Sequence, residues 1–126
     1  HYPLRRQRQM CIRDRPTTMN TREHFISRME DIEVMMISQD YDGLDNYGLE
    51  LKYKPEDDEW HWMLSWGGPQ ETIIMRGRGK NARFFFEYKH WNEYDEFEVT
   101  SPLECVALQT LFMEWFNVED MHDVLQ

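Results

Sequence analysis

Residues 60–66 read WHWMLSW, and their alternation decides the fold of this 126-residue chain. In an extended strand, successive side chains point to opposite faces of a sheet, so every second residue shares a face. Aromatic residues are enriched in strands, because they pack well on a pleated and partly buried surface. The stretch therefore predicts a strand with apolar side chains on both faces. One face would carry Trp60, Trp62, Leu64 and Trp66, and the other His61, Met63 and Ser65.

The same alternation recurs on both sides of this strand along the chain. Strands are predicted at residues 49–53, 72–76 and 83–91, and Phe97 and Val99 mark a fifth. The connections between them are short and rich in turn-forming residues. Parallel neighbours would need crossovers of about a dozen residues or more. We therefore expect an antiparallel meander of five strands.

Helical patterns lie before and after the predicted strands. Thr21 is a candidate N-cap, and apolar residues follow it at helical spacing as far as Ser38. Residues 40–48 are expected to form a turn-rich connection. Residues 101–104, Ser-Pro-Leu-Glu, combine an N-cap serine, a first-turn proline and a capping-box glutamate, and this helix should end at Asn117. The order α-β-β-β-β-β-α predicts an α+β fold, a five-stranded antiparallel meander flanked by an N-terminal and a C-terminal helix.

The first fifteen residues differ in composition from the rest of the chain. They hold five arginines and one aspartate, and residues 10–15, MCIRDR, resemble a translated sequencing adapter. The alternatives are a disordered basic arm and a nucleic-acid-binding tail. We interpret residues 1–18 as non-native or disordered. Residues 19–126 are expected to form a single domain.

Removing this segment changes the charge balance. The chain has 14 basic and 24 acidic residues and a net charge of −10, so the remainder has 9 and 23, a net charge of −14. Cys105 is then the only cysteine, and an unpaired cysteine is typical of a reducing compartment. No apolar run approaches the roughly 18 residues that a membrane-spanning helix needs. The sequence predicts a cytoplasmic protein that does not act at a membrane.

Aromatic residues of two strands form a candidate interaction surface. Two terminal helices can cover one face of the sheet, so aromatic side chains on the other face would remain open. Exposed apolar patches usually mark interaction sites, here for an unknown protein partner or a second copy of the chain. The alternative is that these residues fill the core of a curved sheet. The candidate residues are Trp60, Trp62, Trp66, Phe84, Phe86, Tyr88 and Trp91.

The sequence indicates no catalytic residue, metal site or cofactor. Residues 40–45 place carboxylates close together, but, counted from Asp40, leucines stand at positions 5 and 12, where a calcium-binding EF-hand loop needs ligands. A small enzyme would have to use His61, His90 or Cys105. None of these lies in a motif with zinc-site spacing or in a nucleophile motif. We therefore expect a non-enzymatic protein-binding or self-associating module, with an enzyme as an alternative.

A second alternative is a role related to nucleic acid. The basic turn formed by Arg76, Arg78, Lys80 and Arg83 precedes three phenylalanines, and such an arrangement can hold single-stranded nucleic acid. The net charge of −14 opposes phosphate contacts. Conversely, an acidic surface could imitate DNA. Its residues would be Asp57, Asp58, Glu59, Glu93, Asp95, Glu96 and Glu98.

Two short motifs resemble a pattern in small phage-encoded proteins of unknown function. They are Leu64-Ser65-Trp66-Gly67-Gly68-Pro69 and Glu87-Tyr88-x-x-Trp91, and the similarity spans residues 49–116. His90 stands where that pattern often has aspartate. The resemblance implies a phage or mobile-element accessory protein, and it implies no activity or catalytic residue.

Overall fold

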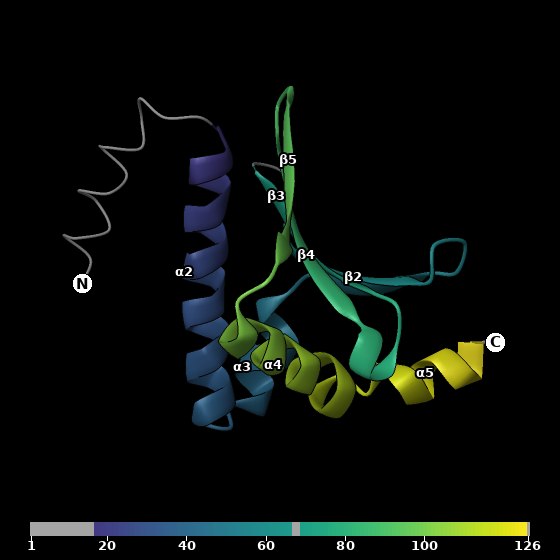
Figure 1. The fold of residues 1–126 in the computed structure, drawn as a ribbon. Coiled ribbons are helices and arrows are strands. Elements are labelled where there is room, and N and C mark those ends of the chain that lie inside the picture. The colour runs from purple at the N-terminus through teal and green to yellow at the C-terminus, as the bar shows by residue number, and fades with distance from the viewer. Residues whose placement is uncertain (1–16, 67–68, 126) are drawn as a thin grey trace.

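The computed structural model describes residues 17–66 and 69–125. Residues 1–16, which make up most of the segment interpreted as non-native or disordered, lie outside these ranges, as do Gly67 and Gly68 of the phage-like motif. The predicted meander is confirmed, because five antiparallel strands form one sheet in chain order (Figure 1). The strands are β1 (Glu50–Lys54), β2 (Glu59–Ser65), β3 (Gln70–Arg76), β4 (Arg83–His90) and β5 (Glu93–Val99).

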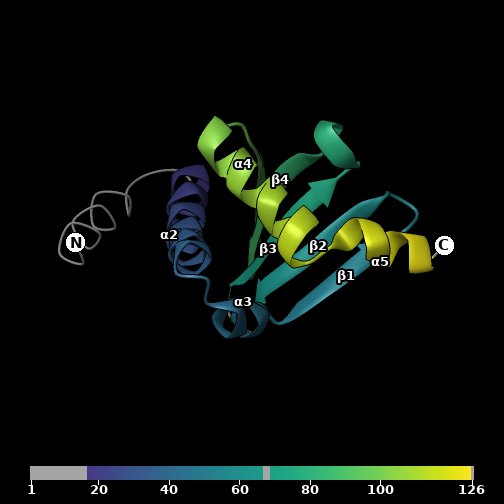
Figure 2. The same ribbon diagram turned by 90° about the horizontal axis from the view of Figure 1, so that it is seen from below.

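Helices precede and follow the sheet, which makes the fold α+β as predicted. Figures 1 and 2 show that they gather on one side of the sheet and leave its other side open. In the described ranges no helix is long and apolar enough to cross a membrane. The helical segments are α2 (Thr17–Ile37), α3 (Tyr41–Tyr47), the 3-10 turn η1 (Gly79–Asn81), α4 (Pro102–Thr110), the π-helical η2 (Leu111–Trp115) and α5 (Val118–Leu125).

Two predictions about the N-terminal helices are wrong. The helix α2 begins at Thr17, so Thr21 lies inside it and is fully buried instead of capping it. The predicted turn-rich stretch forms the helix α3. Its N-cap is Asp40, whose carboxylate accepts a hydrogen bond of 3.0 Å from the backbone N–H of Gly43. Aspartate is favoured both in turns and at N-caps, so composition alone does not separate the two.

The C-terminal helix begins at Pro102, and its helical turns end at Trp115, two residues before the predicted end at Asn117; its last turns are wider than an α-helix. The Phe116 N–H donates to the Leu111 carbonyl over 2.9 Å, five residues back, which defines a π-helix. Asn117 lies just beyond the helix with a φ of 55°, and α5 follows it. Ser101 precedes Pro102, but its side chain makes no capping hydrogen bond.

The core lies between the sheet and the helices. Strand pairing places every second residue of β2, β3 and β4 on the helix side, where α2 packs against β5 and α4 against β4. This core contains nine sheet residues and eight helix residues. They are Trp60, Trp62, Leu64, Ile73, Met75, Phe84, Phe86, Tyr88 and Val99, and Phe25, Met29, Ile32, Leu44, Leu108, Leu111, Phe112 and Val118.

A buried carboxylate ties α2 to the sheet. Glu71 on β3 is 4% exposed and accepts a hydrogen bond from Arg28 Nε over 3.0 Å, and His24 Nδ1 lies 3.5 Å from it. Burial alone would raise the pKa of Glu71, but hydrogen bonds and charge from His24 and Arg28 outweigh it and hold that pKa below its ordinary value. Arg28 also donates to the Tyr47 hydroxyl over 3.2 Å, and Tyr47 donates to Asp31 over 2.7 Å. The network therefore joins α2, α3 and β3.

Gly48 allows the chain to pass close to the buried Trp62 indole. A Cβ at this position would lie 2.7 Å from Trp62 Cε2 and closer still to Nε1, while the backbone has an ordinary extended conformation. Replacing Gly48 by alanine should therefore lower the free energy of unfolding by about 1–2 kcal/mol through overpacking. Urea unfolding measures this, with Asp45→Ala in the exposed part of α3 as the control. Equal stability of the two variants would contradict the close packing.

Candidate functional site

The open face is the side of the sheet that no described helix covers. Strand register places mainly charged and polar side chains on it, in contrast to the aromatic face under the helices. The central apolar residues of this face are nevertheless covered, since Ile74 is only 1% exposed and Phe85, beneath the arginine side chains of Arg76 and Arg83, is 6% exposed. The other strand residues on the open face are Glu50, Lys52, Lys54, Glu59, His61, Met63, Gln70, Thr72, Arg76, Arg83, Glu87, Lys89, Tyr94, Glu96 and Glu98.

The prediction of an aromatic interaction surface is wrong for five of its seven residues, because these five are buried. Trp60, Trp62, Phe84, Phe86 and Tyr88 are at most 4% exposed and lie in the core. The alternative interpretation holds for them, because the helices cover the face on which β2 and β4 carry their largest aromatic side chains. The other two, Trp66 and Trp91, are 67% and 92% exposed. Since β2 and β4 are both antiparallel to β3, these two tryptophans follow strands that end at the same end of the sheet.

The predicted basic turn is largely neutralised by acidic neighbours. Arg76 pairs with Glu59, Arg78 pairs with Asp58 at 3.3 Å, and Arg83 pairs with Glu98 at 2.7 Å. Hydrogen bonds and charge from Arg83 hold the pKa of Glu98 below its ordinary value. The guanidinium groups of Arg76 and Arg83 also lie over the Phe85 ring, 4.1 and 5.3 Å from its centre. These three arginines therefore form ion pairs within the protein. Their partners Asp58, Glu59 and Glu98 belong to the predicted acidic surface.

The three candidate catalytic side chains do not come together. His61 lies on the open face, where its Nε2 is 2.8 Å from Glu59. His90 lies on the helix side of β4 beside Trp91, with 6.1 Å between ring centres. The Cys105 thiol donates to the Val99 carbonyl over 3.1 Å, and burial and nearby Glu104 and Glu98 raise its pKa. In the described part of the chain, no group of three or more His, Cys, Asp or Glu side chains could hold a metal ion.

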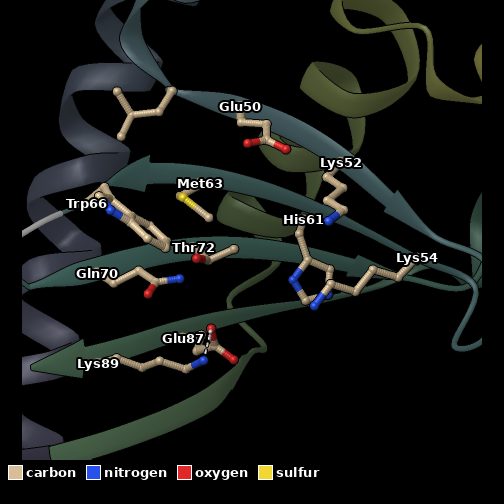
Figure 3. A pocket seen from close by; sticks show the side chains of 11 residues that line it. Glu50, Lys52, Lys54, His61, Met63, Trp66, Gln70, Thr72, Glu87 and Lys89 are labelled. Atoms are coloured by element: carbon tan, nitrogen blue, oxygen red, sulfur yellow. Dashed lines mark ion pairs between the residues drawn. The ribbon is translucent and has the colours of Figure 1, made fainter.

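The open face contains a groove of about 500 Å³, which the sequence did not reveal. Figure 3 shows Lys52, Lys54 and His61 toward one end and Trp66 with Gln70 toward the other, with Thr72 between them. The alternation at residues 49–54 could have placed both lysines on one face, but only strand pairing places them opposite His61 and Glu59. The lining residues are Leu49, Glu50, Lys52, Lys54, His61, Met63, Trp66, Gln70, Thr72, Glu87 and Lys89.

A hairpin tip, formed by Trp91 and Tyr94, projects beyond the groove. The tip of the β4–β5 hairpin extends past the end of α2 at the top of Figure 1. Only two residues connect its strands, and the first, Trp91, has a φ of 58°. Tyr94 is 56% exposed, and its hydroxyl donates toward Glu87 and Glu96 at 3.2 and 2.9 Å. Partial burial and these carboxylates raise the pKa of Tyr94, so its ring stays neutral.

Charge is distributed unevenly between the two sides of the molecule. The segment 21–47, which holds most of α2 and all of α3, has seven acidic and two basic residues. Residues 100–121, which hold α4 and η2, have four acidic and no basic residues. The remaining lysines and arginines of the described ranges lie on the strands and their connections. The helical side is therefore strongly acidic, and the open face is close to balanced.

Comparison with known proteins gives no relative. No protein-family model, no curated protein and no solved structure matches the chain.

Proposed function

We propose that this protein is a non-catalytic binding module that engages another protein through the hairpin tip. The observation that carries the proposal is Trp91. Its side chain is 92% exposed, so it contributes almost nothing to the core. Tryptophan, tyrosine and arginine are the residues that most often dominate the affinity of protein interfaces.

The backbone of Trp91 strengthens this argument. A bulky residue at positive φ is strained, and left-handed conformations of non-glycine residues cost about 1–3 kcal/mol. Two-residue hairpin turns prefer glycine, asparagine or aspartate at positions with positive φ. A tryptophan here therefore lowers stability without burying its ring. A contact with a partner would offset that cost.

The other functions considered have less support. The arginines of the basic turn are paired with Asp58, Glu59 and Glu98, which leaves less charge for phosphate contacts. The same pairs reduce the acidic surface that a DNA mimic would present. An enzyme would need His61, His90 or Cys105 to converge, and they lie on different parts of the fold.

The variant Trp91→Gly separates binding from folding. Glycine adopts positive φ without strain, so stability should stay equal or rise by about 1 kcal/mol. Affinity for the partner should fall about 30-fold or more, as expected for an interface anchor worth at least 2 kcal/mol. The partner is first isolated as a stoichiometric complex with the wild-type protein. Its affinity for each variant is then measured with both components purified.

The matched control is Leu103→Ala, which removes a large side chain that is 82% exposed on α4. It should bind the partner as the wild type does. Sedimentation of the protein alone shows whether the partner is a second copy, in which case Trp91→Gly should abolish a dimer. A strictly monomeric protein without a stoichiometric partner, or unchanged affinity in Trp91→Gly, would refute the proposed function.

A further inference from the structure

The open-face groove holds a polar group without a partner. Thr72 is 2% exposed, and its Oγ1 has no hydrogen-bond partner within residues 17–66 and 69–125. Buried polar groups almost always have one, because leaving a hydroxyl unpaired costs free energy. Thr72 is also one of the residues that line the groove, between the lysine end and Trp66 (Figure 3). Its Oγ1 has almost no accessible surface, so a polar atom of a molecule in the groove becomes its partner only when the Thr72 side chain rotates to turn the hydroxyl toward the groove.

The charges of the groove favour an anion. Its lining has three lysines and two glutamates, a net charge of +1 on a chain of net charge −10. One of these glutamates, Glu87, already has a partner: its carboxylate lies 3.6 Å from Lys89 Nζ and accepts a hydrogen bond from the Tyr94 hydroxyl. Lys52 and Lys54 form no ion pair with the described carboxylates. Both project from the edge strand β1 into the groove (Figure 3).

The opposite end of the groove favours an aromatic or apolar group. Trp66 is 67% exposed, so a face of its ring is accessible for stacking. Met63 lines the groove between Trp66 and His61, and its flexible thioether packs well against rings of different shapes. A volume of about 500 Å³ lies within the range of about 300–1,000 Å³ that small-molecule sites occupy.

We propose that this groove binds a small ligand in which an aromatic ring carries a carboxylate. The ring packs against Met63 and Trp66, the carboxylate lies toward Lys52 and Lys54, and the Thr72 hydroxyl donates to an oxygen of the ligand. Either a free aromatic acid or the carboxyl-terminal aromatic residue of a polypeptide presents this chemistry. The site is separate from Trp91, and the inference does not depend on the proposed function.

The probe is 2-naphthoate, with 2-naphthamide as its uncharged counterpart. The protein is labelled with ¹³C at the methionine methyl groups and ¹⁵N at the tryptophan indoles, and 2-naphthoate is added. We expect the NMR signals of the Met63 methyl group and the Trp66 indole to shift. The amide should bind about tenfold more weakly, since it lacks the charge that the lysines attract. A peptide ending in phenylalanine with a free carboxylate tests the second source. If this peptide binds more tightly than naphthoate, the ligand is a polypeptide end. If it binds more weakly, the ligand is a free aromatic acid.

Two variants test the assigned contacts. Thr72→Val keeps the shape of the side chain and removes the hydroxyl, so it should weaken naphthoate binding about three- to tenfold while the protein stays folded. Lys52→Gln combined with Lys54→Gln should weaken it about tenfold or more. The matched control is Arg78→Gln with Lys80→Gln, which removes the same formal charge outside the groove and should change affinity less than about twofold.

Three results would each overturn the inference. They are equal binding of naphthoate and naphthamide, equal losses in the lysine double variant and its control, and no shift at Met63 or Trp66. Trp91→Gly should bind naphthoate as the wild type does. Failure of the hairpin proposal and failure of the groove proposal are therefore distinguishable.

Discussion

Phe112→Ala is expected to lower the free energy of unfolding by about 4 kcal/mol, since full burial of a phenylalanine leaves a large cavity on truncation. Phe112 is 0% exposed and lies in the π-helical turn. Its ring centre is 5.7 Å from that of Phe84, 6.5 Å from Trp62 and 5.5 Å from Phe116. It therefore joins two central strands to the C-terminal helices, and its loss should loosen those helices as well as reduce overall stability.

Urea unfolding followed by circular dichroism and tryptophan fluorescence measures both effects. The control Val106→Ala shortens a side chain that is 65% exposed on α4 and should change stability by less than about 0.5 kcal/mol. If the C-terminal helices detach first, the two signals should separate in Phe112→Ala and coincide in the control. A loss below about 1.5 kcal/mol would show that Phe112 is not a central contact.

Glu71→Gln is expected to lower the free energy of unfolding by about 2 kcal/mol at neutral pH. Removing one member of a buried ion pair typically costs about 3–5 kcal/mol, and the partial exposure of Arg28 reduces the effect here. Glutamine keeps the shape of the side chain but leaves Arg28 without its charged partner. Glu56→Gln, in the exposed β1–β2 turn, is the matched control and should be nearly neutral.

The same carboxylate should make stability depend on pH. Because the folded pKa of Glu71 is lower than the unfolded value, its stabilisation is complete above the ordinary glutamate pKa of 4.5 and is lost as the pH falls through the folded pKa. The stability difference between wild type and Glu71→Gln should therefore be largest near neutral pH and shrink in acid. A difference that stays constant from about pH 7 to pH 3 would contradict this assignment.

The strands could be predicted because side chains that face the same side of a sheet recur at every second residue, and this alternation is visible in the sequence. Residues 60–66 and 83–91 alternate so clearly that their strands are located to within about one residue. The beginning of β5 is less evident from the sequence. Phe97 and Val99 mark only the second half of the fifth strand, whereas β5 begins at Glu93 and extends the hairpin.

The candidate site could be predicted only in part, because alternation does not say which face the helices cover. Trp62 and Phe86 alternate with His61 and Phe85, and only the packing of the helices decides which pair faces the helices. Trp91 was identified as a candidate, but its positive φ depends on the length of the hairpin turn. The groove depends on strand register and sheet curvature, which place Thr72 between side chains from distant parts of the sequence.

The uneven charge distribution also gives the part of the protein that the structure describes an electric dipole, with its negative end on the helical side. A negatively charged molecule approaching in solution would experience a torque that turns the open face toward it. Added salt screens both this torque and the repulsion by the net charge of −10, so it should change the association rate more than the dissociation rate. At about 0.15 M salt the orienting field extends roughly 8 Å, so it acts during the last step of approach.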